Sequence, residues 1–140
     1  MTLSLVVRPG GFDDTDGFTP RWLAPRLFND GSTYLAVVRG DGTEVARIEM
    51  VDQTHPGHYV GVTESPKFIK IHMIEVHSRH RRRGIAVSTL DLLADRYPER
   101  QLLAFSEADE FWESVGWARH VHRDDDPDAP RHQVLFIQPG

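Results

Sequence analysis

The segment between residues 68 and 97 constrains this chain most strongly, because it joins a strand pattern to a helix pattern through an arginine-rich turn. Residues 68–76 are rich in β-forming side chains, and residues 84–97 carry apolar side chains at helical spacing. At the junction, Gly84 lets a ligand approach the backbone, and the small Ala86 permits a second close approach. The N–H groups at a helix start also attract anions. The segment therefore predicts a site for a polyphosphate ligand.

Four arginines of this turn can donate charge-assisted hydrogen bonds to phosphate oxygens: Arg79, Arg81, Arg82 and Arg83. The competing interpretation is a solvated charge run or a nucleic-acid patch. The whole chain has 16 Lys and Arg against 21 Asp and Glu, a net charge of -5, and no aromatic residue is interleaved with the arginines to stack on bases. We therefore expect a phosphate site and no nucleic-acid partner.

The turn resembles the acyl-CoA signature of the GNAT superfamily of acetyl-CoA-dependent N-acetyltransferases. The sequence Arg81-Arg82-Arg83-Gly84-Ile85-Ala86 is similar to the motif Gln/Arg-x-x-Gly-x-Gly/Ala, and Val76 stands five residues earlier, like the strand valine of that family. Residues 108–117 are similar to the family's second-helix pattern, Ala-x-x-Phe-Tyr-x-x-x-Gly-Phe. Together the two motifs cover residues 68–121 and are more specific than either alone.

The resemblance implies an enzyme that moves an acetyl group from acetyl-CoA directly to a primary amine of a small molecule or a protein. It also implies that the pantetheine arm lies along a strand near residues 74–76, where one main-chain N–H polarises the thioester carbonyl. The cofactor-binding set that follows is Ile74, Val76, Arg81, Arg82, Arg83, Gly84, Ile85, Ala86 and Trp112. No motif identifies the acceptor, for which we expect a small-molecule or peptide amine.

Catalysis needs a group that accepts the proton of the acceptor, because an amine with a pKa of about 10.4 is almost wholly protonated at neutral pH. His72 is the first candidate, since its unperturbed pKa is about 6.5 and GNAT enzymes often place a base four residues before the strand valine. A purely structural histidine is the alternative. Strict alternation predicts Lys70, His72, Ile74 and Val76 on one face and Ile71, Met73 and Glu75 on the other. Glu75 carries a carboxylate and is the second catalytic candidate. Because it is expected on the opposite face from His72, a hydrogen-bonded or salt-bridged supporting role explains it better.

Trp112 departs from the family pattern, because many members have a tyrosine there that protonates the leaving thiolate. An indole N–H donates hydrogen bonds but is not a useful acid. Trp112 then packs beside the pantetheine arm or belongs to the helix core. Solvent, Ser106, Ser114 and Tyr59 remain as proton donors. The missing tyrosine also leaves open a GNAT-fold module that binds or senses acyl-CoA with little or no turnover.

The whole pattern predicts one α/β (α+β) domain over residues 1–140, with a GNAT-like mixed, mostly antiparallel sheet, flanking helices and a central β-α-β crossover. The predicted strands are 3–8, 33–39, 44–51, 68–76, 101–105, 117–121 and 133–137. The predicted helices are a broken one that begins near Thr19 and is interrupted by Pro25, one over 84–97, and one between Ser106 and Gly116. Residues 52–67 are expected to form mainly a loop.

The remaining composition limits other function classes. The chain has no cysteine, which excludes disulfides, thiolate metal sites and a Cys nucleophile. Five histidines between residues 55 and 80 lack a zinc-helix motif, so we expect no metal. The N-terminus is a poor signal peptide and no apolar stretch is long enough to span a membrane, so a cytoplasmic protein without a membrane partner is the expectation. Family analogy allows a homodimer through residues 134–137, although a core position explains these residues equally well.

Overall fold

The computed structural model describes residues 1–8, 12, 16–23, 32–52 and 54–140 of the chain. Pro25, where we expected the first helix to break, lies outside these residues. Within the described parts, no helix is long and apolar enough to cross a membrane.

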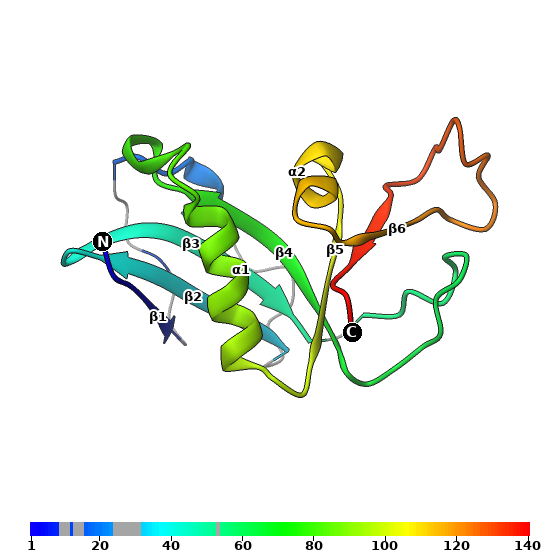
Figure 1. The fold of residues 1–140 in the computed structure, drawn as a ribbon, viewed down its shortest axis with the longest axis horizontal. Coiled ribbons are helices and arrows are strands. Elements are labelled where there is room, and N and C mark those ends of the chain that lie inside the picture. The colour runs from blue at the N-terminus through cyan, green and yellow to red at the C-terminus, as the bar shows by residue number, and fades with distance from the viewer. Residues whose placement is uncertain (9–11, 13–15, 24–31, 53) are drawn as a thin grey trace.

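A seven-stranded sheet organises the molecule (Figure 1). Its strands are β1 (Leu3–Arg8), β2 (Thr33–Gly40), β3 (Thr43–Val51), β4 (Phe68–Val76), β5 (Gln101–Phe105), β6 (Ala118–His120) and β7 (Leu135–Ile137). They lie in the order β1-β2-β3-β4-β5-β7-β6. The pair β4–β5 is parallel, and every other neighbouring pair is antiparallel. The predicted mixed, mostly antiparallel sheet is therefore confirmed, although β6 and β7 are shorter than expected.

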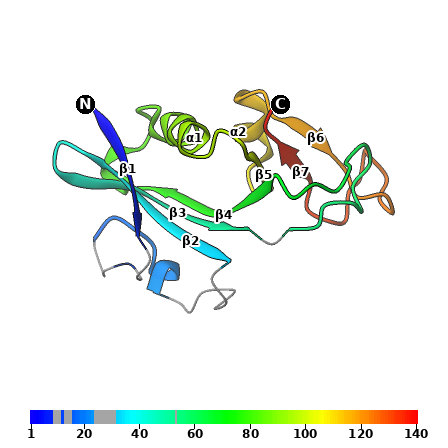
Figure 2. The same ribbon diagram turned by 90° about the horizontal axis from the view of Figure 1, so that it is seen from below.

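Helices cover both faces of this sheet. The helices α1 (Ile85–Arg96) and α2 (Asp109–Ser114) lie on one side, and the 3-10 helix η1 (Pro20–Leu23) lies on the other (Figure 2). A second short 3-10 helix, η2 (Ser78–His80), precedes α1. The order β4-η2-α1-β5 is the predicted crossover.

The main core lies between the sheet and the face of α1 that carries Ile85, Leu90 and Leu93. The sheet side of this core consists of alternate residues of β2–β5: Ala36, Val38, Ala46, Ile48, Met50, Ile69, Ile71, Leu102 and Ala104. The alternate side chains of the strands and the apolar face of α1 thus pack together as one apolar layer. In β7 and just before it, residues 134–137 are buried within the chain itself, so their core explanation holds.

Two glycines have the backbone conformation that their turns require. Asp41 (φ 51°) and Gly42 (φ 77°) turn the β2–β3 hairpin with positive φ at both positions, as the sequence Gly40-Asp41-Gly42 predicts. Gly116 (φ 80°) follows α2, the position predicted for helix termination.

Candidate functional site

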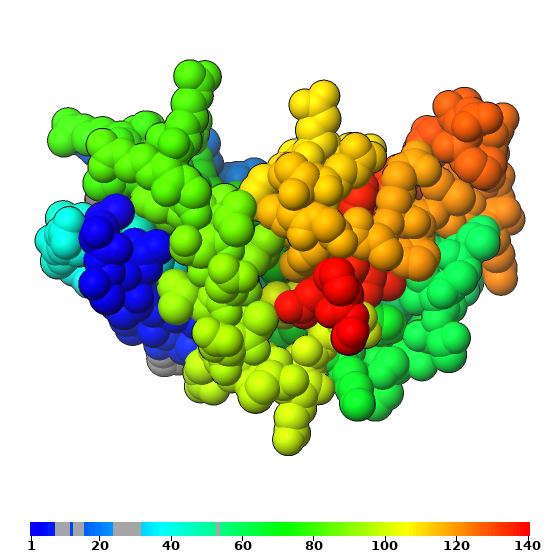
Figure 3. All heavy atoms as spheres, in the orientation of Figure 1, coloured from blue at the N-terminus to red at the C-terminus, as the bar shows by residue number. Residues whose placement is uncertain are grey.

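A cleft opens where β4 and β5 separate. The two strands pair only from Phe68 to Lys70 of β4 and from Gln101 to Leu103 of β5. Beyond these pairs lies a cavity of about 510 Å³, bounded by the second half of β4, the end of β5 and the start of α1 and α2. In the space-filling view, a notch separates the atoms of α1 and its preceding turn from those of α2 (Figure 3). The separation begins after Lys70 and includes residues 74–76, where the family resemblance implies the pantetheine arm.

His72 lies on a β-bulge of β4. Opposite Glu49 of β3 stands Met73, but opposite the next residue, Met50, stands Ile71, so His72 has no partner in the register. A bulge adds one residue to a strand and shifts the alternation that follows. Ile71 and Ile74, three residues apart, consequently share the α1 face through their partners Met50 and Ile48.

For this reason the predicted faces of β4 are correct after the bulge, from Met73 to Val76, but wrong before it, for Lys70 and Ile71. The register places Ile74 and Val76 on the α1 face, whereas Lys70, Met73 and Glu75 lie on the η1 face. A strict period of two cannot anticipate a bulge, because no residue type in 68–76 marks one. The bulge is nevertheless a common device for re-aiming a side chain beside an active site.

His72 is exposed to the cleft and lines the cavity. Partial burial lowers the pKa of its imidazole, and the positive charges of Lys70 and Arg21 lower it further, against the opposing effect of Glu49 and Glu107. The imidazole is therefore neutral at pH 7 and can accept a proton. The structure places the predicted base candidate in the cleft, and its catalytic role stays a prediction.

Glu75 lies outside the cavity lining and is buried, with 8% of its surface exposed. Its Oε1 accepts hydrogen bonds from Thr19 N (3.0 Å), Thr19 Oγ1 (3.1 Å) and Trp22 Nε1 (2.6 Å), and Arg81 lies 3.4 Å from Oε2. Burial raises the pKa of Glu75, but the hydrogen bonds from Thr19 and Trp22 lower it by more. These contacts fit the supporting role rather than a base that must bind and release protons.

The turn before α1 has the geometry of an anion site. Gly84 (φ 73°) precedes the first helical residue, and α1 has no side-chain cap. A Cβ at Gly84 would meet no heavy atom within 4 Å, so the space in front of this backbone is open. The first helical N–H groups lack intrahelical acceptors and face a favourable dipole. Arg82 and Arg83 are exposed beside them.

The other members of the predicted cofactor set are placed in three different ways. Ile74, Val76, Ala86 and Trp112 line the cavity. Ile85 is buried in the core with 3% exposure, which leaves its backbone rather than its side chain for a ligand. The guanidinium of Arg81 turns back to Val76 O (3.3 Å) and Glu75, so it braces the turn against β4.

Trp112 belongs to both the cavity wall and the core. Only 5% of it is exposed, and its ring lies 4.9 Å from Phe111 and 4.6 Å from Trp117 between centroids. The core position expected for this side chain is confirmed, and its packing beside the pantetheine arm stays a prediction. Its indole is held by aromatic packing.

None of the side chains suggested as proton donors lines the cavity among the described residues. The hydroxyl of Tyr59 donates to Gln133 O (2.8 Å), and Ser114 Oγ donates to Phe111 O (2.6 Å). Ser106 Oγ accepts from Ala108 N (2.9 Å) in the turn before α2. The expectation that Ser106 caps this helix is wrong, because α2 begins at Asp109 with Ala108 at the N-cap position and no side-chain cap. Solvent remains as the proton source.

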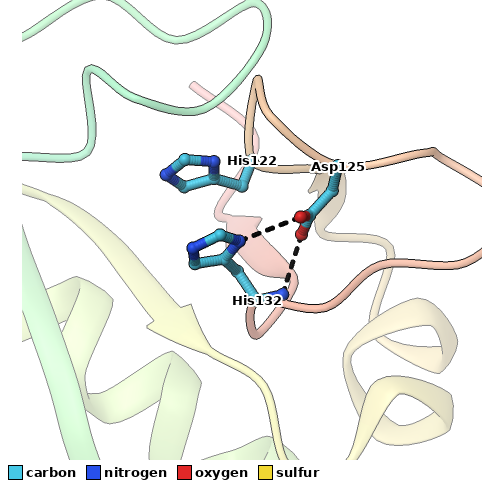
Figure 4. Close-up of side chains that lie close together, drawn as sticks. All are labelled: His122, Asp125 and His132. Atoms are coloured by element: carbon cyan, nitrogen blue, oxygen red, sulfur yellow. Dashed lines mark hydrogen bonds and ion pairs between the residues drawn. The ribbon is translucent and has the colours of Figure 1, made fainter.

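A cluster that sequence reasoning missed lies outside the cleft, in the connection from β6 to β7 (Figure 4). His122, Asp125 and His132 each place one potential metal ligand within 4.8 Å of the others. Each side chain already has a partner, since His122 Nδ1 accepts from Asp124 N and Asp125 accepts from the backbone of residues 131 and 132. The rings of His122 and His132 also stack at 3.8 Å. We interpret these three residues as a loop clamp, a cluster that holds the connection between β6 and β7 in place. It could not be recognised from the sequence, because His122 and His132 are ten residues apart.

Comparisons with known proteins agree on one family. Residues 4–128 match the family model described as the Acetyltransferase (GNAT) family. No curated protein sequence matches the chain.

Solved structures show the same fold at low sequence identity. An acetyltransferase from Thermus thermophilus has a TM-score of 0.56 at 14% identity, over 80% of this chain and 67% of its own. The aminoglycoside acetyltransferase AAC(6')-Ib, solved with coenzyme A, has a TM-score of 0.55 at 13% identity, over 76% of this chain and 66% of its own. A protein from Exiguobacterium sp. 255-15, provisionally described as an acetyltransferase, has a TM-score of 0.57 at 16% identity. The match covers 99% of this chain and 93% of that protein.

This chain thus spans about two thirds of the first two of these structures. The predicted fold class is confirmed by the similarity. Because the family match covers most of the 140 residues, the chain belongs to the GNAT acetyltransferase family.

Proposed function

We propose that the chain is an acetyl-CoA-dependent N-acetyltransferase that moves the acetyl group directly to a primary amine of a small molecule or a protein. The observation that carries this proposal is the cavity between β4 and β5, whose lining runs from Val76 and Ala86, beside the anion-site turn, to His72 on the bulge. The base candidate and two residues that flank the anion-site turn thus line one cavity. The coenzyme A bound by the similar fold of AAC(6')-Ib supports the choice of ligand.

The residues present fit the pyrophosphate of a CoA molecule. The open space before Gly84, the uncapped start of α1 and the exposed guanidinium groups of Arg82 and Arg83 offer backbone and charged donors together. Ile74 and Val76 line the cavity on the part of β4 that pairs with β3 but not with β5, so the β5 side of their main chain is available to a ligand. These main-chain groups would hold the pantetheine arm.

In the proposed reaction, acetyl-CoA supplies the acetyl group as a thioester. His72 accepts one proton from the acceptor amine. The neutral amine nitrogen bonds to the acetyl carbon while the carbon–sulfur bond breaks; the nitrogen then releases its second proton to solvent, and the thiolate sulfur takes a proton from solvent. Holding both substrates in one cleft makes the transfer effectively intramolecular.

Titration calorimetry with acetyl-CoA tests the cofactor site. We expect the wild type to bind and Gly84→Glu to lose at least about tenfold in affinity, because a carboxylate would occupy the phosphate position. Gly42→Glu is the matched control: Gly42 also has positive φ (77°) and open space, but lies in the β2–β3 turn. It should bind like the wild type. No wild-type binding, or equal binding by Gly84→Glu, would overturn the proposal.

A second candidate is an acyl-CoA-binding or sensing module with little turnover, favoured by the packed Trp112 where a proton donor is common in the family. A broad panel of amines, monitored for free CoA, separates the two. CoA release above background with any acceptor rejects the sensing module. Tight acetyl-CoA binding with no release on the whole panel rejects the enzyme.

A further inference from the structure

Charged side chains of both signs line the cleft, and they come from different elements. Arg21 of η1 and Lys70 of β4 bring two positive charges to its lining, and Glu107, from the β5–α2 connection, brings a negative one. His72 lies within electrostatic range of all three. The cleft therefore offers opposite charges on different walls around the proposed base.

Lys70 is a half-buried charge of this cleft that has no close ion-pair partner among the described residues. Burial lowers the pKa of its ammonium, with Glu49 opposing this effect. Among the described residues, no carboxylate lies within 4.0 Å of the ammonium and no hydrogen bond engages it. Its nitrogen lies 5.6 Å from the centroid of the Phe105 ring, a contact that offsets only part of the cost of burying a charge.

The position of Lys70 is equally specific. It forms the last β4–β5 pair, with Leu103, so it stands at the closed end of the separation between the strands. The anion-site turn lies at the other end of β4, beyond Val76, and His72 lies between them. Lys70 and His72 are two residues apart, roughly 6–7 Å along a strand. A ligand group beside Lys70 is therefore on the acceptor side of the base.

Resting on the proposed function, we propose that the acceptor is an amine that carries a carboxylate a few carbon atoms from its nitrogen, with the carboxylate bound by Lys70 and Arg21. The amine then lies at His72, where Glu107 attracts its protonated form before the proton is removed. An anionic group at Lys70 supplies the close ion-pair partner that no described residue provides, in addition to the more distant charge of Glu49. A simple alkylamine would leave the half-buried ammonium without such a partner.

Three matched acceptors test the inference: 4-aminobutyrate, its amide 4-aminobutanamide, and butylamine. With the wild type we expect kcat/KM for the acid to exceed that for the amide by at least about tenfold, the scale of one charge-assisted contact. Lys70→Met should bring the ratio to about one, and Lys70→Arg should keep most of it. Lys67→Met removes the same charge from an exposed site just before β4 and should leave the ratio unchanged.

Product binding gives a readout that needs no turnover. In the presence of CoA, N-acetyl-4-aminobutyrate should bind at least about tenfold more tightly than its amide, and Lys70→Met should remove the difference. If acetyl-CoA binds but acid and amide are equal in both measurements, or if the preference survives Lys70→Met, the inference is wrong and the proposed function stands. If acetyl-CoA does not bind at all, both are wrong.

Discussion

Trp22 donates its indole N–H to Glu75 Oε1 at 2.6 Å and thereby ties η1 to β4. Both groups are buried, with 5% and 8% of their surfaces exposed. Thr19 donates twice to the same oxygen, so the carboxylate remains charged in spite of its burial. We infer that this contact holds the strand that carries His72.

The Trp22–Glu75 contact should make a measurable, pH-dependent contribution to stability. Trp22→Phe removes a hydrogen bond to a charged acceptor, so we expect a loss of about 1.5–3 kcal/mol in the free energy of unfolding at pH 7 by urea titration. The folded pKa of Glu75 lies below its ordinary value of about 4.3. Its stabilising effect is therefore complete above that value and is lost as the pH falls through the folded pKa.

The matched control is Trp117→Phe, which truncates another buried tryptophan that has no carboxylate partner among the described contacts. The loss in unfolding free energy caused by Trp117→Phe should not depend on pH between pH 7 and the lowest pH at which the protein is folded. The difference in unfolding free energy between the wild type and Trp22→Phe, in contrast, should become smaller at acidic pH. A difference of constant size would show that Trp22 contributes only packing.

Protonation of His72 should make kcat/KM fall at acidic pH, which gives the pH profile an acid limb. Burial, with Lys70 and Arg21, lowers the pKa of His72, so kcat/KM should fall only when the pH drops below about 6.5. His72→Gln should lower kcat/KM by about 10²–10⁴-fold and abolish this limb. His55→Gln, at an exposed position in the loop before β4, should keep both rate and profile. A limb that persists in His72→Gln would assign it to another group.

Trp112 should prove more important to stability than to chemistry. Trp112→Phe keeps an aromatic ring but leaves space beside Trp117, for which we expect a loss of about 1–3 kcal/mol in unfolding free energy. Because an indole is not an acid, kcat should stay within about threefold of the wild type. A drop in kcat of more than about tenfold in fully folded protein would give Trp112 a direct part in the reaction.

The sequence predicted the fold well where local patterns and tertiary packing agree. The turn at Gly84, the hairpin at Gly42 and the helix stop at Gly116 each need positive φ, which a sequence can signal. The faces of Lys70 and Ile71 relative to the rest of β4 were not predictable, because the bulge at His72 depends on pairing with β3 and not on the composition of β4.

The candidate site was predictable only in part for the same reason. The Gly84–Ala86 motif signals its own backbone geometry, and Arg82 and Arg83 follow from it. The environment of Lys70 depends instead on where β5 leaves β4 and on Phe105, which is distant in sequence. The role of Arg81 as a brace likewise depends on the position of Glu75.

The loop clamp should hold the connection between β6 and β7 through Asp125. Its carboxylate is shielded from solvent and accepts hydrogen bonds from Arg131 N (3.1 Å) and His132 N (2.8 Å), while His132 Nδ1 lies 2.9 Å away. Burial raises the pKa of Asp125, but these contacts from His132 and Arg131 lower it by more. The clamp should therefore stay charged at pH 5.

Asp125→Ala removes the acceptor of these amides, so their hydrogen exchange should accelerate by at least about tenfold, because local opening of the loop would no longer have to break these hydrogen bonds. Asp128→Ala, an exposed change in the same loop, should leave the exchange rates unaltered. Because Gln133 follows the clamp and lines the cavity, Asp125→Ala should also raise KM for the acceptor more than it lowers kcat. Unchanged exchange at residues 131 and 132 would mean that the loop is held by its stacked histidines and not by Asp125.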